Sequence, residues 1–235
     1  MLELNDLAVS FQNQDILKNV NIKILKGQVH LLVGKSKSGK STLTHYLAGY
    51  STLKRTAGKS IYNKKILDKI PSQKRFYSGI FPVFQYTPEL DCICLDDIVH
   101  NYICSTAQDP DLVYEKLDSI LEKLDLKKNI IYNPIGLKFL GLDEIKRLEF
   151  AQILLFEPNL VIIDQIEDNL DKEFSGMFID IINSIRKRKK SALIMTNDQF
   201  LLDNIDADYL HILNDGTTSS FTNKKDFLKG VKDDH

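Results

Sequence analysis

The stretch Gly34-Lys35-Ser36-Lys37-Ser38-Gly39-Lys40-Ser41 decides the fold of this chain. It matches the pattern Gly-x-x-x-x-Gly-Lys-Ser, in which backbone N–H groups and a helix N-terminus surround phosphate groups. The context also fits, because the apolar run Val29–Val33 before it is typical of a buried parallel strand and a helical stretch, residues 42–48, follows it. In such loops the lysine reaches the β- and γ-phosphates and the serine hydroxyl binds Mg²⁺. The stretch therefore predicts a nucleoside triphosphate site.

A carboxylate at the end of another apolar strand adds to this prediction. Leu160–Ile163 has the pattern of a second buried strand, and Asp164 follows it directly. An aspartate that ends a strand is common, and alone it indicates no particular function. Beside a phosphate-binding loop, however, its oxygen atoms are suited to hold Mg²⁺ on the side opposite Ser41.

Strands and helices alternate along most of the chain, which predicts an α/β core. Alternating apolar residues indicate a strand over Leu4–Phe11, and a second strand ends near Leu25. The middle of the chain, residues 88–156, has a helical pattern instead, with apolar residues of 117–124 on one helix face. We predict a single domain of 235 residues, in which a helical subdomain at about 88–156 is inserted into the α/β core.

The composition excludes several other classes of protein. Hydrophobic residues make up 43% and charged residues 27% of the chain, which excludes a disordered or fibrous protein. The net charge of −1 provides no basic field for nucleic acid, so we expect no nucleic-acid partner. No apolar run approaches the roughly 18 residues of a membrane span, and no secretory signal is recognised. We expect a cytoplasmic protein.

With these features, the chain resembles an ATP-binding cassette (ABC) ATPase over nearly its whole length. The resemblance implies an ABC-type P-loop core with an antiparallel β subdomain and the helical insert, with ATP and Mg²⁺ as cofactors. It implies that Phe11 stacks on adenine, although an aromatic residue there also suits a core strand. The nucleotide-binding residues it implies are Phe11, Gly34, Lys35, Ser36, Lys37, Ser38, Gly39, Lys40, Ser41, Thr42, Gln85 and Asp164, of which Ser41, Gln85 and Asp164 would hold the metal.

Two further segments match the family in ways that concern partners. Gln85 matches a glutamine that senses a transmembrane partner, and residues 168–171 match a segment that crosses a dimer interface. Within the family, Leu90 with Asp97, the terminal Glu144 of the signature-like region and the Asn-Leu-Asp of residues 169–171 are similar to the lipoprotein-release, macrolide-export and cell-division cassettes. A peptide-importer cassette is the alternative.

Two positions linked to hydrolysis depart from the family pattern. The family places a glutamate that polarises water directly after the strand-ending aspartate, but here this residue is Gln165. An amide holds water without accepting its proton, and general-base catalysis contributes roughly 10²–10⁴-fold, so we expect slow hydrolysis. Asn197 stands in place of the switch histidine and could donate a hydrogen bond toward a γ-phosphate oxygen. We therefore assign Lys40, Gln165 and Asn197 to the catalytic positions.

The signature motif is altered as well. The family sequence Leu-Ser-Gly-Gly-Gln/Glu falls here on Leu140-Gly141-Leu142-Asp143-Glu144. Gly141 removes the hydroxyl, and Leu142 adds bulk. Asp143 either brings a negative charge toward a phosphate, which is unfavourable where solvent is excluded, or points to solvent.

The resemblance implies partners and leaves the rate of hydrolysis open. In the family, each ATP lies between the phosphate loop of one cassette and the signature of a second, which is either the same or a different chain. We expect a cytoplasmic ATP-binding subunit, peripheral on the inner face of the membrane, that couples ATP to a transmembrane permease-type subunit. The alternatives are a hydrolysis-deficient regulatory or structural module and a small-molecule P-loop kinase.

A second candidate site involves sulfur and imidazole ligands. Cys92, Cys94, His100 and Cys104 form a Cys₃His set that would suit zinc, with His100 and Cys104 four residues apart on one helix face. Against this, the Cys92–Cys94 spacing is one residue too short, and free cysteines are commonly buried core residues. The sequence shows no partners for His30, His45 and His211, and it indicates no nucleophile paired with a base.

Overall fold

The fold comes from a computed structural model, which describes residues 1–86, 90–136, 138–166 and 172–221. The chain divides into two compact units. The first unit contains residues 1–85, 158–167 and 179–235, and the second contains residues 86–157 and 168–178. The second unit overlaps the stretch that the sequence predicts as a helical insert. Each unit is described by itself.

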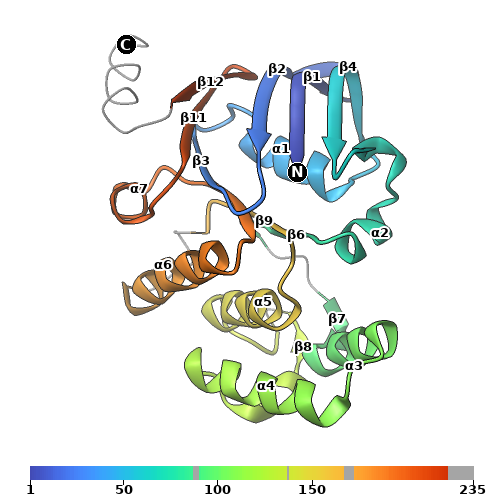
Figure 1. Ribbon diagram of the computed structural model, residues 1–235, viewed down its shortest axis with the longest axis vertical. Coiled ribbons are helices and arrows are strands. Elements are labelled where there is room, and N and C mark those ends of the chain that lie inside the picture. Colours follow the sequence, from blue (N-terminus) through green and yellow to red (C-terminus); the bar gives the residue numbers. More distant parts are fainter. Residues whose placement is uncertain (87–89, 137, 167–171, 222–235) are drawn as a thin grey trace. The chain divides into compact units, whose positions relative to one another are not determined.

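Among the described residues, ten strands form one sheet in the first unit, in the order β5-β4-β1-β2-β12-β11-β3-β10-β9-β6 (Figure 1). The strands are β1 (Leu2–Phe11), β2 (Gln14–Ile24), β3 (Val29–Val33), β4 (Leu53–Tyr62), β5 (Lys65–Ile66), β6 (Ile80–Val83), β9 (Leu160–Asp164), β10 (Ser191–Met195), β11 (Tyr209–Asn214) and β12 (Thr217–Phe221).

The sheet has a parallel and an antiparallel part. Strands β11, β3, β10, β9 and β6 run parallel to one another, whereas β1, β2, β4 and β5 pair antiparallel. All residues of β3, β9 and β10 are buried, as expected for strands covered on both faces. The predicted α/β class with an antiparallel β subdomain is therefore confirmed. The sequence pattern does not predict strand β4, because Leu53–Tyr62 is rich in polar residues and shows no regular alternation of buried and exposed positions.

Helices flank the parallel strands. They are α1 (Lys40–Ala48), α2 (Ser72–Tyr77), α7 (Gln199–Asn204) and α6 (Lys172–Lys187), the last of which begins in the second unit and ends in the first. Helix α1 begins inside the phosphate-binding loop and packs against β6 and β9. Leu43 and Leu47 are fully buried in the core with Leu32, Ile162 and Leu193 of the strands. The buried side of α1 thus fixes the loop to the sheet.

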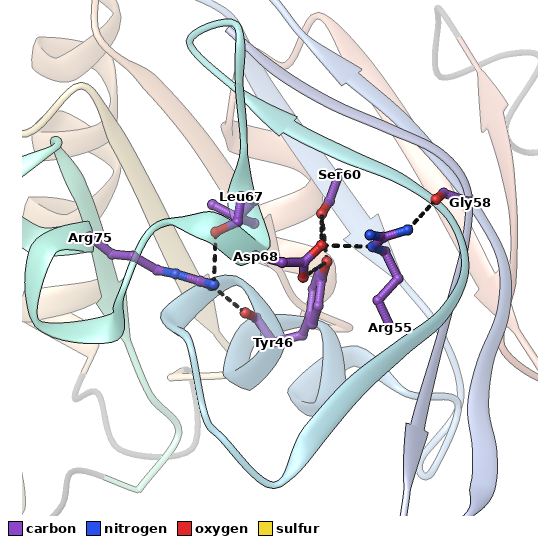
Figure 2. A network of polar contacts seen from close by, with 7 residues as sticks. All are labelled: Tyr46, Arg55, Gly58, Ser60, Leu67, Asp68 and Arg75. Carbon is purple, nitrogen blue, oxygen red and sulfur yellow. Dashed lines mark hydrogen bonds and ion pairs between the residues drawn. The ribbon is translucent and has the colours of Figure 1, made fainter.

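The C-terminal end of α1 is held by Arg75, a buried arginine of α2 (Figure 2). Its guanidinium donates to the carbonyls of Tyr46 at 2.6 Å and Leu47 at 2.9 Å, and to that of Leu67 at 3.1 Å. Leu67 belongs to a short 3₁₀ helix, Leu67–Lys69. A cation is favoured here because the last carbonyls of a helix have no intrahelical donors. The arginine therefore links α1 to the segment between β5 and β6.

Figure 2 also shows a second polar cluster beside this arginine. Asp68 accepts from Arg55 Nε at 2.7 Å and from the Tyr46 hydroxyl at 2.8 Å. Burial opposes ionisation of Asp68, but the hydrogen bonds from Arg55 and Tyr46 outweigh it and lower the pKa of the carboxyl. The ion pair joins strand β4 of the antiparallel part to the same short segment.

The second unit is mainly helical. Its helices are α3 (Leu95–Thr106), α4 (Pro110–Lys123) and α5 (Leu142–Phe156), with a 3₁₀ helix at Lys128–Tyr132. Leu117, Leu121 and Leu124 are buried, which confirms the predicted apolar face. The strands β7 (Leu90–Cys94) and β8 (Pro134–Ile135) form a two-stranded antiparallel sheet. The sequence pattern predicts helices over residues 88–156 and did not predict this short sheet.

Candidate nucleotide site

The candidate site lies at the carboxyl ends of four neighbouring strands of the first unit. Strands β3, β10, β9 and β6 are adjacent and parallel. The residues Gly34, Asn197, Asp164 and Gln85 end or follow these strands. In open α/β sheets, ligands bind outside the carboxyl ends of the strands. The topology therefore gathers residues that are far apart in the sequence around the phosphate-binding loop.

The glycines of the loop are required by close approach and by backbone conformation. A Cβ atom on Gly34 would lie 2.4 Å from the carbonyl oxygen of Leu213 and 2.7 Å from Ser38 Oγ. Gly39 has φ +109°, in the left-handed region, and its Cβ would lie 2.7 Å from Leu17 Cδ2. The loop thus has a tightly wrapped backbone whose two glycines leave no room for side chains.

Lys40 is 3% exposed and lies within the loop. Its ammonium group donates to the Gly34 carbonyl and, at 3.1 Å, to the Lys35 carbonyl. Both carbonyls belong to the loop itself. The predicted phosphate-binding cation is therefore at the centre of the loop, where an anion would attract it.

Two buried polar atoms test whether the site fits a nucleotide and Mg²⁺. Ser38 Oγ and Asp164 Oδ1 are buried and make no hydrogen bond within the described chain. Such atoms are rare in proteins unless a ligand, ion or water satisfies them. Burial raises the pKa of Asp164, although the Ser41 hydroxyl and the charges of His45 and Lys40 act in the opposite direction. A hydroxyl beside a buried carboxylate is a hard oxygen donor set, so Ser41 and Asp164 fit Mg²⁺.

Gln165 occupies a constrained position directly after β9. Its φ is +43°, which is uncommon for a residue with a side chain, and its N–H donates to the Met195 carbonyl at 2.9 Å. The residue is half-buried. The backbone at this position is therefore fixed by the neighbouring strand β10, so the amide side chain starts from a defined point beside Asp164.

Asn197 contacts the loop in a way that the sequence did not predict. Its Oδ1 accepts from the Gly34 N–H at 3.2 Å, and its Nδ2 donates to the Gly34 carbonyl at 3.0 Å. The amide side chain thus pairs with both polar groups of the first glycine of the loop.

Two histidine arrangements correct the expectation that His30, His45 and His211 have no partners. His30 Nδ1 lies 2.9 Å from His211 Nε2, and both residues are buried. His45 Nδ1 donates to the Ser41 carbonyl at 2.6 Å, because a carbonyl oxygen can only accept. The His45 ring also stacks on the ring of Phe84, with 5.1 Å between the two ring centroids. Phe84 is the residue directly before Gln85 in the sequence. Sequence spacing gave no signal for these pairs.

The remaining predicted residues lie on the loop, on the helix after it or at the ends of strands of the same sheet. Phe11 ends β1 and is 40% exposed, so its ring is accessible to a planar ligand. Gln85 follows β6 and is half-buried. Lys35, Ser36 and Lys37 are exposed on the loop, and Thr42 is half-buried in α1. The predicted dimer segment, residues 168–171, lies outside the described residues.

The signature-like residues belong to the second unit, at the start of α5. Leu140 is buried, whereas Gly141, Leu142 and Asp143 are exposed. The Glu144 carboxylate accepts from the Gly141 N–H at 2.9 Å and so caps the helix. Asp143 lies 3.9 Å from Arg147 Nε, so a cation on the next helical turn partly balances its charge.

The cysteine and histidine set is not gathered into a metal site. Cys104 Sγ lies 3.7 Å from His100 Nε2, while Cys94 Sγ donates to Asp97 at 3.0 Å. Cys92 and Cys104 are exposed. Within the ranges that the structure describes, no group of three or more His, Cys, Asp and Glu residues could hold a metal ion.

The fold and the loop geometry define a P-loop nucleotide-binding protein. The family model described as ABC transporter matches residues 17–166, and the chain belongs to this family. It is 33% identical over 228 residues to a probable ATP-dependent transporter of Synechocystis, covering 92% of this chain and 87% of the relative.

Other relatives and solved structures agree with this assignment. The probable ATP-dependent transporter SufC of Escherichia coli is 30% identical over 223 residues, covering 92% of this chain and 90% of the relative. The iron-sulfur cluster assembly protein SufC of Plasmodium berghei is 31% identical over 225 residues, covering 92% of this chain and 61% of the relative. The solved ATP-binding subunit of an ABC transporter has a TM-score of 0.82 at 16% identity, covering 99% of this chain and 93% of that chain.

Another similar solved structure contains a bound nucleotide. A dimeric ATP-binding cassette in a post-hydrolysis state, bound to ADP and Pi, has a TM-score of 0.77 at 17% identity, covering 94% of this chain and 98% of that chain. At this identity the likeness shows the fold alone. None of the helices in the described ranges has both the length and the apolar character needed to cross a bilayer.

Proposed function

We propose that this chain is an ATP-binding subunit of an ABC-type complex, in which it binds Mg·ATP tightly and hydrolyses it slowly. The observation that carries the proposal is the pair of buried, unsatisfied atoms Ser38 Oγ and Asp164 Oδ1 beside the buried Lys40. The loop backbone and Lys40 would bind the β- and γ-phosphates, and Ser41 with Asp164 would hold Mg²⁺. Bound Mg²⁺ would neutralise charge on the phosphates. Phe11 and Gln85 are proposed as further contacts to adenine and to the metal.

Slow hydrolysis follows from the residue after Asp164. Gln165 has a fixed backbone beside the strand ends, and its amide can orient water but cannot take a proton from it. The test is single-turnover hydrolysis by the parent chain, Gln165→Glu and the control Gln165→Ala. We expect Gln165→Glu alone to accelerate the reaction, by about 10²-fold. Equal rates for the parent chain and both variants would indicate that the signature residues Gly141–Glu144, and not Gln165, limit hydrolysis.

Nucleotide binding is tested separately with Lys40→Ala. Removing this buried cation should weaken ATP binding by at least about 100-fold, because charge-assisted contacts to phosphate are lost. A variant that binds ATP as tightly as the parent, or a parent chain that hydrolyses ATP rapidly alone, would overturn the proposal.

Membership of the ABC family suggests which kinds of partner protein the chain has. The complex would include a second cassette, the same chain or another, and a partner protein moved by ATP binding. A transmembrane permease-type subunit is the first candidate, and it would place the chain at the inner face of the membrane. The names of the relatives favour a second candidate, the ATPase of an iron-sulfur cluster assembly complex. At subgroup level, these relatives favour a SufC-like cassette over the lipoprotein-release group or a peptide importer.

Isolation of the native complex distinguishes these candidates. The tagged chain is purified from cells in the presence of ATP, once with detergent and once without. Because Gln165 should make hydrolysis slow, we expect the ATP-bound complex to stay closed during purification. A co-purifying polytopic membrane protein that needs detergent supports the permease. A partner that co-purifies without detergent and carries iron and acid-labile sulfide supports the assembly complex. A monomer with no partner in either preparation contradicts both.

A further inference from the structure

We propose that Asn197 is a positioning residue that holds the first peptide groups of the phosphate-binding loop, so that it supports binding of ATP and ADP equally. This assignment differs from a role in sensing the γ-phosphate, and it rests on the proposed nucleotide binding. Asn197 pairs through Oδ1 with the Gly34 N–H at 3.2 Å and through Nδ2 with the Gly34 carbonyl at 3.0 Å.

This pairing requires an amide side chain. One donor and one acceptor, side by side, match the N–H and C=O of a single residue in the way that a neighbouring peptide does. The two nitrogens of a neutral imidazole point in different directions, so a histidine could not satisfy both groups of Gly34. An aspartate would supply acceptors alone. The asparagine at this position is therefore chemically matched to the loop and not merely a shorter histidine.

The backbone on both sides of Asn197 is fixed, which directs the amide toward the loop. On one side, the Thr196 N–H donates to the Leu32 carbonyl at 3.2 Å and continues the ladder between β10 and β3. On the other side, Asp198 caps α7, because its Oδ1 accepts from the Leu201 N–H at 2.8 Å. Asn197 is therefore held between a strand and a helix cap without any ligand.

The Gly34 carbonyl has two donors, and this explains why the asparagine matters for binding. Lys40 Nζ also donates to that carbonyl. When the Lys40 ammonium turns to a phosphate, Asn197 still pairs with the carbonyl, so the loop keeps its shape. The phosphates that the loop and Lys40 bind include the β-phosphate, which ATP and ADP share. Loss of the asparagine should therefore affect both nucleotides.

Equilibrium binding of Mg·ATP and Mg·ADP tests this inference in the full chain. The variants are Asn197→Ala, Asn197→His and the control Asn204→Ala, which removes an exposed asparagine amide that donates to the Phe200 carbonyl within α7. We expect Asn197→Ala to weaken both nucleotides by about 5- to 10-fold, with an unchanged ratio of their dissociation constants. Asn197→His should weaken the binding of ADP as much as Asn197→Ala does. Asn204→Ala should bind both nucleotides as tightly as the parent chain.

Hydrogen exchange of the nucleotide-free chain provides a readout that does not depend on binding. Asn197→Ala should accelerate exchange in residues 34–41 while the core strands stay protected, and Asn204→Ala should not. Weaker binding of ATP alone, or unchanged binding and unchanged exchange, would overturn the inference. If the parent binds neither nucleotide, the proposed function fails, and the exchange measurement still decides whether Asn197 holds the loop.

Discussion

The buried pair His30 and His211 should make the stability of the fold strongly dependent on pH. Burial lowers the pKa of His30 to about 4. Burial, together with the charge of His30, lowers the pKa of His211 to about 3. Both values lie below the ordinary value of 6.5 that the unfolded chain would show. The unfolded chain therefore binds protons that the folded chain excludes, so the contribution to stability is fully present above pH 6.5 and is lost as the pH falls toward 4.

The hydrogen bonds around the pair explain why neutral imidazoles are favoured. The Gln28 Oε1 atom accepts from the Leu25 N–H at 2.8 Å and lies 3.2 Å from His30 Nε2, which must then be the donor. His30 Nδ1 then accepts from His211 Nε2, and His211 Nδ1, 2.7 Å from Ser220 Oγ, accepts from that hydroxyl. With both rings neutral, every ring nitrogen has a suitable partner. A proton on each ring would place two N–H groups against each other.

The magnitude follows from proton linkage. Consider a histidine whose pKa is 6.5 in the unfolded chain and about 4 in the folded chain. Its contribution to the free energy of unfolding is about 2 kcal/mol smaller at pH 5 than at pH 8, so the two histidines together account for a loss of about 4 kcal/mol. Urea unfolding followed by circular dichroism at pH 8, 7, 6 and 5 measures this loss. The parent chain is compared with a His30→Gln/His211→Gln variant and with His100→Gln, which changes an exposed histidine of α3.

The comparison uses the change with pH, because the substitutions themselves alter stability. Between pH 8 and pH 5, we expect the free energy of unfolding of the parent chain and of His100→Gln to fall by about 4 kcal/mol more than that of the double variant. His211→Gln alone should remove about half of that difference. If the double variant shows the same pH dependence as the parent chain, the two imidazoles do not remain neutral in the fold.

Three further predictions concern the loop, the helix that follows it and the carboxylate that ends β9. Gly34→Ala should destabilise the fold by about 2 kcal/mol in thermal or urea unfolding, because its Cβ would lie 2.4 Å from a backbone oxygen; an unchanged midpoint would contradict this. Arg75→Met should lower the free energy of unfolding by about 3 kcal/mol, since buried carbonyls at the end of α1 lose a charged donor, whereas Lys74→Met, at an exposed position of the same helix, should be nearly neutral. Asp164→Asn should stabilise the nucleotide-free chain, because burial raises the pKa of this carboxyl, and should also abolish the Mg²⁺ dependence of ATP affinity measured by calorimetry. A destabilised Asp164→Asn chain that keeps this dependence would show that the carboxylate is structural.

Much of the fold and the core of the site could be predicted because their signals are local. The loop Gly34–Ser41 carries its chemistry in eight consecutive residues, and Asp164 ends an apolar run that is recognisable by itself. Helix faces and buried strands repeat with fixed periods, which is why α4 and β9 agree with expectation. Strand β4 was missed for the same reason, since its exposed polar residues show no period.

The unpredicted contacts depend on strand pairing, which no local pattern specifies. His30 and His211 are 181 residues apart, and they meet because β11 pairs parallel to β3 with His211 beside Leu32. Asn197 and Gly34 are 163 residues apart and meet because β10 lies on the other side of β3. The resemblance to the family singled out Asn197 as a candidate position, but by analogy with a residue of different hydrogen-bonding geometry.

The crowding around Gly34 separates two kinds of requirement within one motif. Leu213 closes over this glycine from a strand near the end of the described chain, so the residue must be small whether or not any ligand ever enters. A descendant of this fold that had abandoned nucleotides altogether would still need glycine at 34. A glycine at this position is consequently evidence of the fold, and it does not by itself indicate that a nucleotide is bound.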